Sequence, residues 1–275
     1  MPTFPPVFAK KTQHLPDNNT LPMSRKVINL FVLTIFGAAF CKNQPKDAGK
    51  VTLNAEGRQE FSAIYGSPIL DGSGADDVWA ASDWLPIDQV WFGAKPSAED
   101  FEGRYKLAWD ENNLYILAEI ADDSLQEIHP EGTERYRDDD CLEIFIDEDA
   151  SGGEHQYNYN AFAYHIALDG TVMDMTPDST YRFFNDHCLI RMINRGHETT
   201  WEIAVRIYDE AAAEDQEEGV PQLLKSGKKM GFALAYNDND GSPERENCIG
   251  NVIIPDGNKN RAWSDAGVFG LLYLR

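Results

Sequence analysis

The 275-residue sequence predicts an all-β protein, an antiparallel and jelly-roll-like β-sandwich that forms a single domain after an N-terminal export signal. Three observations support this fold class. From residue 61 onward, short runs of aromatic and β-branched residues follow one another, clusters of Gly, Asn and Asp separate the runs, and one segment alone has a helical pattern. With 42% hydrophobic residues the chain can bury one substantial core, so a second full domain is not expected.

The expected strands follow in order along the chain. Residues 104–110 alternate between polar and apolar side chains, and residues 113–120 form the next strand after an Asp-Glu-Asn-Asn turn. The further expected strands are residues 141–147, 161–168, 171–175, 200–207, 230–237, 248–254 and 268–274. The short acidic segment 208–218 has the helical pattern, and we interpret it as a surface turn or helix between strands.

Residues 23–41 have the order of an export signal. Arg25 and Lys26 precede an apolar stretch that is too short to span a bilayer comfortably, and small residues follow it. Residues 1–22 are rich in proline and have no signal character. We therefore interpret them as an over-long start and expect Met23 to be the initiator.

Cys41 ends this segment at the place where a bacterial lipoprotein carries its lipidated cysteine. Phe40 stands where that motif prefers a small residue, so cleavage after Ala39 and release of a soluble protein is the alternative. Residues 42–60 are interpreted as a tether, and residues 61–275 as the sandwich. Either processing route predicts an exported protein, which is a lipoprotein of the cell surface or periplasm or a secreted protein.

The charge of the chain excludes some partners. Residues 1–41 contain four of the 24 basic and one of the 46 acidic residues, so the remainder carries a formal charge of −25. Such a surface repels phosphate backbones and anionic lipid, which argues against nucleic acid and leaves a lipid anchor as the expected link to a membrane. Neutral ligands and divalent cations fit it better.

The cysteines after Cys41 do not predict a metal site. Cys141, Cys188 and Cys248 are odd in number and lack metal-ligand spacing. Cys141 lies in a strand pattern and is interpreted as a small buried residue, while a disulfide between two of the three is an alternative in an exported protein. The sequence also has no phosphate-binding glycine loop and no serine nucleophile elbow.

Six motifs occur in an order that resembles carbohydrate-binding module family 9 over about residues 61–275. They are YGSPILDGSGADDVW (65–79), LAWDENNLYILAEIADD (107–123), DDCLEIFIDED (139–149), TWEIAVRI (200–207), GFALAYNDND (231–240) and AWSDAGVFGLLYL (262–274). The resemblance implies a β-sandwich that binds poly- or oligosaccharide, of the xylan or cellulose type and at chain ends, in the company of polysaccharide-degrading enzymes. It implies no catalytic module in this chain, and no required cofactor.

The resemblance also implies a ligand slot in which two aromatic rings enclose a terminal sugar. Trp263 matches the ring near the chain end, and Tyr136 is the aromatic residue nearest to the second ring, one position out of register. Asp140 and Glu143 match an Asp-x-x-Glu pattern on the acidic strand, where Glu143 is implied to accept hydrogen bonds from sugar hydroxyls.

Further polar residues complete the implied slot. The resemblance implies an arginine at the position that His165 occupies in this sequence. Asn260 and Arg245 fall at polar positions of the implied slot, and Ala235 replaces a residue that is polar in some members. Because strands alternate their faces, Glu143 lies on a largely apolar sheet and needs a partner. A sugar, a water or a buried ion pair with an arginine are all open.

Acidic turns are candidate calcium sites. Asp147 and Asp149, followed by a Ser-Gly-Gly turn, group oxygen atoms that suit a hard cation, and the resemblance implies structural calcium. The alternative is a solvated acidic turn. Asp71 and Asp76 form a similar, weaker candidate before Trp79.

Two rival functions stay open at this stage. A glycosidase would use two carboxyls facing each other at about 5–10 Å, a geometry that a sequence does not show. A haem-binding domain on the same fold would use axial Met, His or Lys ligands. Its candidate ligands are His165, Met173, Met175, His187 and Met192.

The tryptophans outside the slot are interpreted structurally. Trp79 and Trp109 lie in apolar patterns and are expected in the core. Trp84 and Trp91 lie in a less regular stretch, where they either cover the edge of the sandwich or extend a sugar platform.

Overall fold

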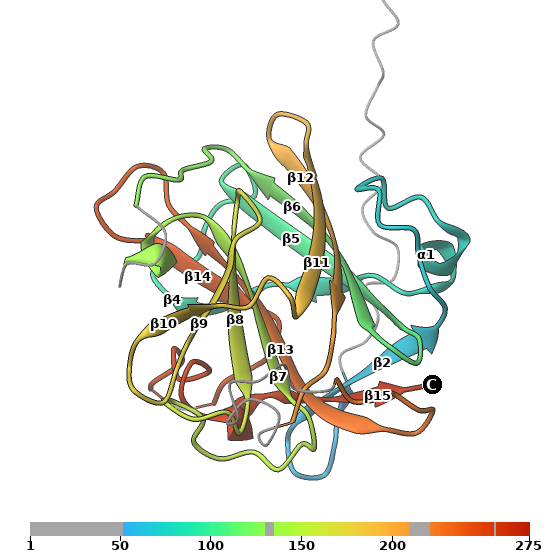
Figure 1. Ribbon diagram of the computed structural model, residues 1–275. Coiled ribbons are helices and arrows are strands. Elements are labelled where there is room, and N and C mark those ends of the chain that lie inside the picture. Colours follow the sequence, from blue (N-terminus) through green and yellow to red (C-terminus); the bar gives the residue numbers. More distant parts are fainter. Residues whose placement is uncertain (1–51, 130–134, 210–220, 256) are drawn as a thin grey trace, which may run out of the picture. The chain divides into compact units, whose positions relative to one another are not determined.

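The computed structural model describes residues 52–129, 135–209, 221–255 and 257–275. Nearly all of its regular structure is β-strand (Figure 1). The elements are β1 Thr52–Leu53, β2 Gln59–Tyr65, α1 Asp77–Ala81, β3 Leu85–Ile87, β4 Gln89–Phe92, β5 Phe101–Trp109, β6 Leu114–Asp122, η1 Tyr136–Asp138, β7 Cys141–Asp147, β8 Phe162–Ala167, β9 Val172–Met175, β10 Tyr181–Phe183, β11 Cys188–Asn194, β12 Glu198–Val205, β13 Lys229–Asp238, β14 Asn247–Gly250, η2 Ala266–Val268 and β15 Gly270–Leu274.

The strands form two layers that β2 joins (Figure 1). The β7 layer has the order β10-β9-β8-β7-β13-β15, with β14 beside β13 and β4 beside β14. The β6 layer has the order β5-β6-β12-β11, with β3 beside β5. One part of β2 pairs with β15 and its last two residues, Ile64 and Tyr65, pair with β5. The sandwich is therefore one curled sheet.

The pairings of β2 correct the expectation of a wholly antiparallel sandwich. Its pairings with β15 and with β5 are parallel, whereas its pairing with β1 and the other strand pairs of the described residues are antiparallel. Antiparallel neighbours can be joined by a tight turn, but β2 is distant in sequence from β15 and separated by about 35 residues from β5, so no hairpin sets its direction. The sheet is mixed for this reason.

The hydrophobic core lies between the two layers. In β7 the even-numbered residues point inward, and each is paired in register with an inward residue of β13. The pairs are Leu142 with Tyr236, Ile144 with Leu234, and Ile146 with Phe232. Rings of the other layer meet them, since Tyr105 lies 6.0 Å from Phe232 and Phe101 stacks 5.5 Å from Tyr236 between ring centres. The apolar alternation seen in the sequence thus corresponds to one buried face.

All nine strands expected from the sequence are present, with two kinds of difference. The strand expected at 248–254 ends at Gly250. The short or polar strands β1, β2, β3, β4, β10 and β11 were not expected, and β1 with the start of β2 falls inside the expected tether. The helical interpretation of 208–218 concerns positions 210–218, which lie outside the described residues, as do the export signal and Cys41.

Cysteines and tryptophans pack inside the sandwich. Cys141, Cys188 and Cys248 are buried free thiols, so the disulfide alternative is wrong, and burial raises the pKa of each thiol. Trp79 and Trp109 are buried as expected. Trp91 is also buried and donates from Nε1 to the carbonyl of Val252 at 2.9 Å, so it covers the sandwich and offers no sugar platform. Trp84 is half-buried beneath the cations of Arg104 and Lys106.

Among the residues that the structure describes, no helix has the length and apolar character needed to cross a membrane.

Candidate functional site

The outward face of the β7 layer carries the polar residues expected to bind ligand. In β7 the odd-numbered residues point away from the β6 layer, which places Glu143 between His165 on β8 and Ala235 on β13. Glu143 is only 4% exposed, so other groups cover this face. A buried carboxylate needs hydrogen-bond or charge partners.

Glu143 has three such partners within the chain. Its Oε1 lies 2.6 Å from His165 Nε2 and accepts a hydrogen bond from Asn237 Nδ2, also at 2.6 Å. The guanidinium of Arg245 approaches the same oxygen to 3.6 Å. We call Glu143, His165, Asn237 and Arg245 the Glu143 group. The buried ion pair considered from the sequence therefore exists, with a histidine and an arginine as partners.

The electrostatics of this group keep Glu143 ionised. Burial by itself raises the pKa of the Glu143 carboxyl, but the charges of His165 and Arg245 and the hydrogen bonds from His165 and Asn237 outweigh it and lower the pKa from 4.5 to about 2. The side chain is thus a fixed negative charge at neutral pH.

Arg245 and Asn237 hold each other in place. Arg245 Nη1 donates to Asn237 Oδ1 at 2.8 Å, and the Arg245 guanidinium carbon lies 5.2 Å from the centre of the Phe92 ring. Phe92 remains 41% exposed at the edge of this face. Asn237 and Phe92 were not among the residues expected in the slot. The alternation of β13 could have pointed to Asn237, because it lies two residues from Ala235 on the same face.

Tyr136 is buried and lies beside the Glu143 group. It begins the short helix η1, and its ring meets the His165 ring edge-on, with 4.6 Å between centres and 89° between planes. The Tyr181 ring contacts it at 5.1 Å. Burial, together with the nearby charges of Asp174 and Glu143, raises the pKa of the Tyr136 hydroxyl well above its ordinary value. Stacking of a sugar on this ring stays a prediction.

Trp263 is on a surface loop that is anchored to the same face. The neighbouring carbonyl of Ala262 lies 2.8 Å from His155 Nε2, and the His155 ring contacts Phe269 at 5.5 Å. Phe269 in turn contacts Phe145, which follows Glu143 by two residues on the outward face of β7. Trp263 itself is 44% exposed. An exposed indole therefore stands on a loop that His155 and Phe269 link to Phe145 of β7, with the half-buried Asn260 in the same loop.

A protein-family model matches most of the chain. The family is described as carbohydrate family 9 binding domain-like, and its model matches residues 69–275. The chain belongs to this family.

Relatives and solved structures agree with this membership. The chain is 26% identical over 219 residues to the exoglucanase XynX of Acetivibrio thermocellus, which covers 78% of the chain and 17% of that protein. It is 34% identical over 97 residues to endo-1,4-beta-xylanase A of Thermotoga neapolitana, which covers 35% of the chain and 8% of that enzyme. The chain thus matches less than a fifth of the length of these relatives.

The fold is also that of solved family 9 modules. A carbohydrate binding module family 9 of Caldicellulosiruptor kristjanssonii, in complex with cellotriose, has a TM-score of 0.59, 22% identity, and coverage of 78% of this chain and 93% of that one. The same module in complex with glucose has a TM-score of 0.57, also with 22% identity, and coverage of 78% and 95%. At this identity the likeness is one of fold.

Asp140, although adjacent to the acidic strand of the family 9 pattern, lies apart from the Glu143 group. It accepts from the Gln126 amide on Oδ2 at 2.5 Å and from the Asn239 amide on Oδ1 at 2.8 Å. Burial, followed by the charge of Asp122, raises the pKa of the Asp140 carboxyl to about 9. Asp140 lies just before β7, and side chains three positions apart along an extended chain point to opposite sides.

The acidic turn after β7 is held by its own backbone. Asp147 Oδ2 accepts from the Gly152 amide at 2.8 Å, and Asp149 Oδ1 accepts from the Ser151 amide at 2.9 Å. In the described part of the chain, the sets of three carboxylates close enough to share a cation lie elsewhere. Calcium at Asp147 and Asp149 stays a prediction.

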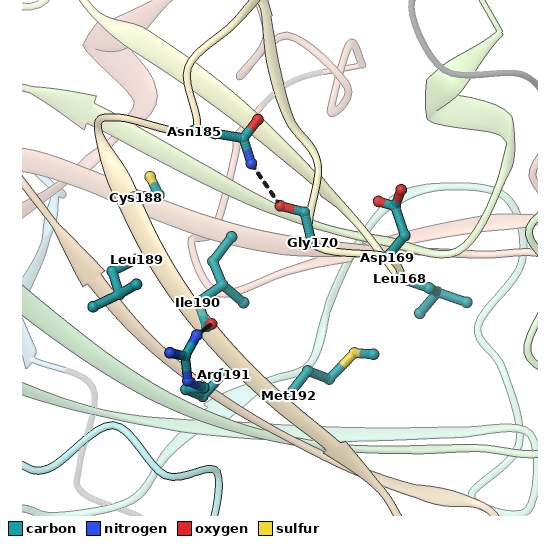
Figure 2. Close-up of a pocket in the computed structure, with 9 residues that line it drawn as sticks. All are labelled: Leu168, Asp169, Gly170, Asn185, Cys188, Leu189, Ile190, Arg191 and Met192. Atoms are coloured by element: carbon teal, nitrogen blue, oxygen red, sulfur yellow. Dashed lines mark hydrogen bonds between the residues drawn. The ribbon is translucent and has the colours of Figure 1, made fainter.

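Two surface hollows lie away from these residues. The hollow in Figure 2 has a volume of about 470 Å³ and is lined by residues 188–192 of β11, by Asp169 and Gly170 of the β8–β9 turn, and by Asn185. Asn185 Nδ2 donates a hydrogen bond to the Gly170 carbonyl at 2.9 Å. A second hollow of about 410 Å³ lies beside Tyr65 and Trp109. No residue of the Glu143 group lines either hollow, so this part of the candidate site is a packed polar face.

The histidines considered as haem ligands belong to different clusters. His165 is bonded to Glu143, and its Nδ1 lies 3.1 Å from the Ala163 carbonyl. His187 stacks on Tyr208 with 3.8 Å between ring centres, and its Nδ1 lies 2.7 Å from the Tyr164 hydroxyl. Each ring already has internal partners.

Proposed function

We propose that this chain is a non-catalytic module that captures the end of a cello- or xylo-oligosaccharide chain. One observation carries the proposal: the exposed Trp263 stands on a loop anchored to the face that holds the buried, charged Glu143 group. Family membership and the family 9 structures in complex with cellotriose and glucose support it.

The two parts of the site supply different interactions. The C–H groups of a pyranose ring can pack on the indole face of Trp263, since an aromatic face carries partial negative charge. Hydroxyl groups can bond to the half-buried Arg245 of the Glu143 group, because an arginine has five N–H donors, more than its internal contacts use. Charge-assisted bonds of this kind are roughly twice as strong as neutral ones.

The internal contacts of Glu143 give the site a fixed geometry. Its carboxylate is held by His165 and Asn237 before any sugar arrives, so little side-chain entropy is lost on binding. Affinity should nevertheless be modest, because sugar hydroxyls give up bonds to water for each bond that they gain.

The proposal extends to cellular context. The relatives named exoglucanase and endo-1,4-beta-xylanase contain a comparable segment within much longer chains, which supports a role beside polysaccharide-degrading enzymes. The signal-like segment 23–41 supports export, with Cys41 as the site of a lipid anchor.

Calorimetric titration of the full chain with cellotriose, xylotriose, glucose and xylose tests the proposal. We expect one of the trisaccharides to bind and Trp263→Ala to weaken it by about tenfold or more, which corresponds to about 1.4 kcal/mol. Tyr65→Ala is the matched control, because Tyr65 is a 57% exposed aromatic residue beside the second hollow.

Four outcomes would contradict it. If no sugar binds the wild-type chain, or if Tyr65→Ala abolishes binding while Trp263→Ala does not, the proposed site is wrong. Release of reducing sugar that depends on Glu143 would favour a glycosidase, and a Soret absorption band in purified protein would favour haem binding.

A further inference from the structure

The second surface hollow has no part in the proposed function. Its volume of about 410 Å³ falls within the range of about 300–1,000 Å³ that is usual for small-molecule sites. We call it the Tyr65 hollow. It combines apolar and aromatic residues with a few polar ones, which is the usual composition of a ligand site. The lining residues are Tyr65, Trp109, Glu111, Leu224, Lys225, Ser226 and Arg275.

Tyr65 supplies an exposed aromatic ring to this hollow. It is the last residue of β2 and is 57% exposed. Its ring meets the buried Trp109 ring edge-on, with 5.0 Å between centres and 73° between planes, and its hydroxyl donates to Glu111 Oε1 at 2.8 Å. Because the ring is held at its edge and at its hydroxyl, little side-chain entropy is lost when a ligand stacks on it.

Lys225 and Arg275 bring positive charge to the same hollow. They lie on adjacent segments, since the Gly227 amide donates to the Leu274 carbonyl at 2.7 Å. In the described part of the chain, neither cation forms an ion pair with an acidic side chain. Arg275 Nε donates to Ser62 Oγ at 2.7 Å, which leaves the other guanidinium N–H groups for a ligand.

The most crowded acidic residues of the described chain lie far from this hollow. Aspartates from four segments cluster where β6 ends, and they include Asp100, Asp122, Asp140 and Asp238. Strand β6 begins beside the hollow, where Leu114 pairs with Trp109, and its nine residues extend for about 27 Å before Asp122. Electrostatic interactions are screened beyond about 8 Å at physiological ionic strength, so this cluster does not repel an anion from the hollow.

The chemistry of the lining matches a hexuronic acid, which is a pyranose ring that carries a carboxylate. The C–H groups of the ring can pack on the face of Tyr65. A sugar hydroxyl can donate to Glu111, whose Oε2 is not used by the bond from Tyr65. The carboxylate can accept charge-assisted hydrogen bonds from Lys225 and Arg275. We propose that the Tyr65 hollow binds a hexuronic acid unit.

This site is separate from the site of the proposed function. The Tyr65 hollow is formed where β2, β5 and β15 end and by residues 224–226, and it shares no residue with the Glu143 group or with the Trp263 loop. The neutral trisaccharides lack a carboxylate, so Tyr65→Ala remains a control for their binding. A chain with both sites would hold a neutral sugar chain and an acidic sugar unit at the same time.

Ligand-observed saturation-transfer NMR of the full chain, with sodium glucuronate at about 0.15 M ionic strength, tests the proposal. Trp263→Ala separates the two sites, because it lacks the indole of the proposed oligosaccharide site. We expect this variant to bind glucuronate with the wild-type Kd and to bind glucose about tenfold more weakly than glucuronate. If glucuronate does not bind the wild-type chain, or if Trp263→Ala abolishes its binding or binds glucose equally well, the proposal is wrong.

Substitutions in the hollow test the role of each group. We expect Tyr65→Ala to raise the Kd for glucuronate about tenfold or more, and Tyr65→Phe to change it about threefold or less, because stacking uses the ring face. Lys225→Gln should raise the Kd about fivefold to tenfold through loss of a charge-assisted bond. Lys95→Gln, at an exposed lysine between β4 and β5, is the matched control and should bind glucuronate as the wild type does.

The Lys225 variant keeps the test decisive should Tyr65→Ala not fold, because its side chain is exposed and has no ion pair to lose. Cellotriose binding should be unchanged in Lys225→Gln, since the neutral sugar binds elsewhere. Wild-type glucuronate binding by Lys225→Gln contradicts the proposal, and so does a loss in Tyr65→Phe as large as that in Tyr65→Ala.

Discussion

Replacing Glu143 by glutamine removes the charge that holds the centre of the candidate site together. In the folded protein the pKa of this carboxyl lies at about 2 instead of 4.5, and each pKa unit corresponds to about 1.4 kcal/mol. The ionised side chain therefore contributes about 3 kcal/mol to the free energy of unfolding at neutral pH. Loss of one partner from a buried ion pair costs about 3–5 kcal/mol in other proteins, which agrees with this value.

The contribution has a defined pH dependence. Because the pKa is depressed on folding, the stabilisation is complete above the unfolded-state pKa of 4.5 and is lost as the pH falls toward about 2. We expect the difference in unfolding free energy between wild type and Glu143→Gln to be largest at neutral pH and to shrink steadily below about pH 4.5.

Urea unfolding followed by tryptophan fluorescence, at several pH values from neutral to about 3, measures this difference. Glu119→Gln is the matched control, because Glu119 pairs with Arg104 on the surface with a side chain that is 38% exposed, and such pairs contribute about 0–1 kcal/mol. A Glu143→Gln difference that is as small as the control, or that stays constant with pH, would refute the role assigned to the Glu143 group.

Two further substitutions test the packing that supports the site. Trp79→Phe removes the indole N–H that donates to Glu202 Oε1 at 2.8 Å. We expect this variant to lose about 1–3 kcal/mol of unfolding free energy, because Glu202 is buried. A loss below about 0.5 kcal/mol in urea unfolding would contradict this contact. Gly250→Ala would place a methyl group 2.1 Å from the Trp91 ring, and we expect a loss of about 1–3 kcal/mol or more from overpacking. A Gly250→Ala variant with wild-type Tm would show that Trp91 can move aside.

Residue patterns allowed much of the fold to be predicted. The alternation of Leu142, Ile144 and Ile146 is a local property of β7, so the strand and its buried face follow from the sequence. Strand β11 was not predicted from the sequence, because its side chains are mostly exposed or half-buried and therefore give no apolar alternation. The parallel pairing of β2 with β15 could not be predicted from the sequence either, since the two strands are distant in the chain.

The candidate site was predictable in part. Glu143, His165 and Arg245 were expected on one polar face, and the structure brings them together. Asn237 was missed because its partner Glu143 lies 94 positions away along the chain. Asp140 was grouped with Glu143 by the Asp-x-x-Glu pattern of the family, whereas the structure places its carboxylate beside those of Asp122 and Asp238.

The sequence alone determined nine of the fifteen strands, the buried face of β7, and the family to which the six motifs are similar. These properties depend on spacing over a few residues, which the chain carries locally. Only the tertiary structure decided that β2 joins the layers, that a histidine of β8 and an arginine of the β13–β14 loop keep Glu143 ionised, and that aspartates from four segments meet. Each of these depends on contacts between distant residues, and such contacts exist only once the strands have paired.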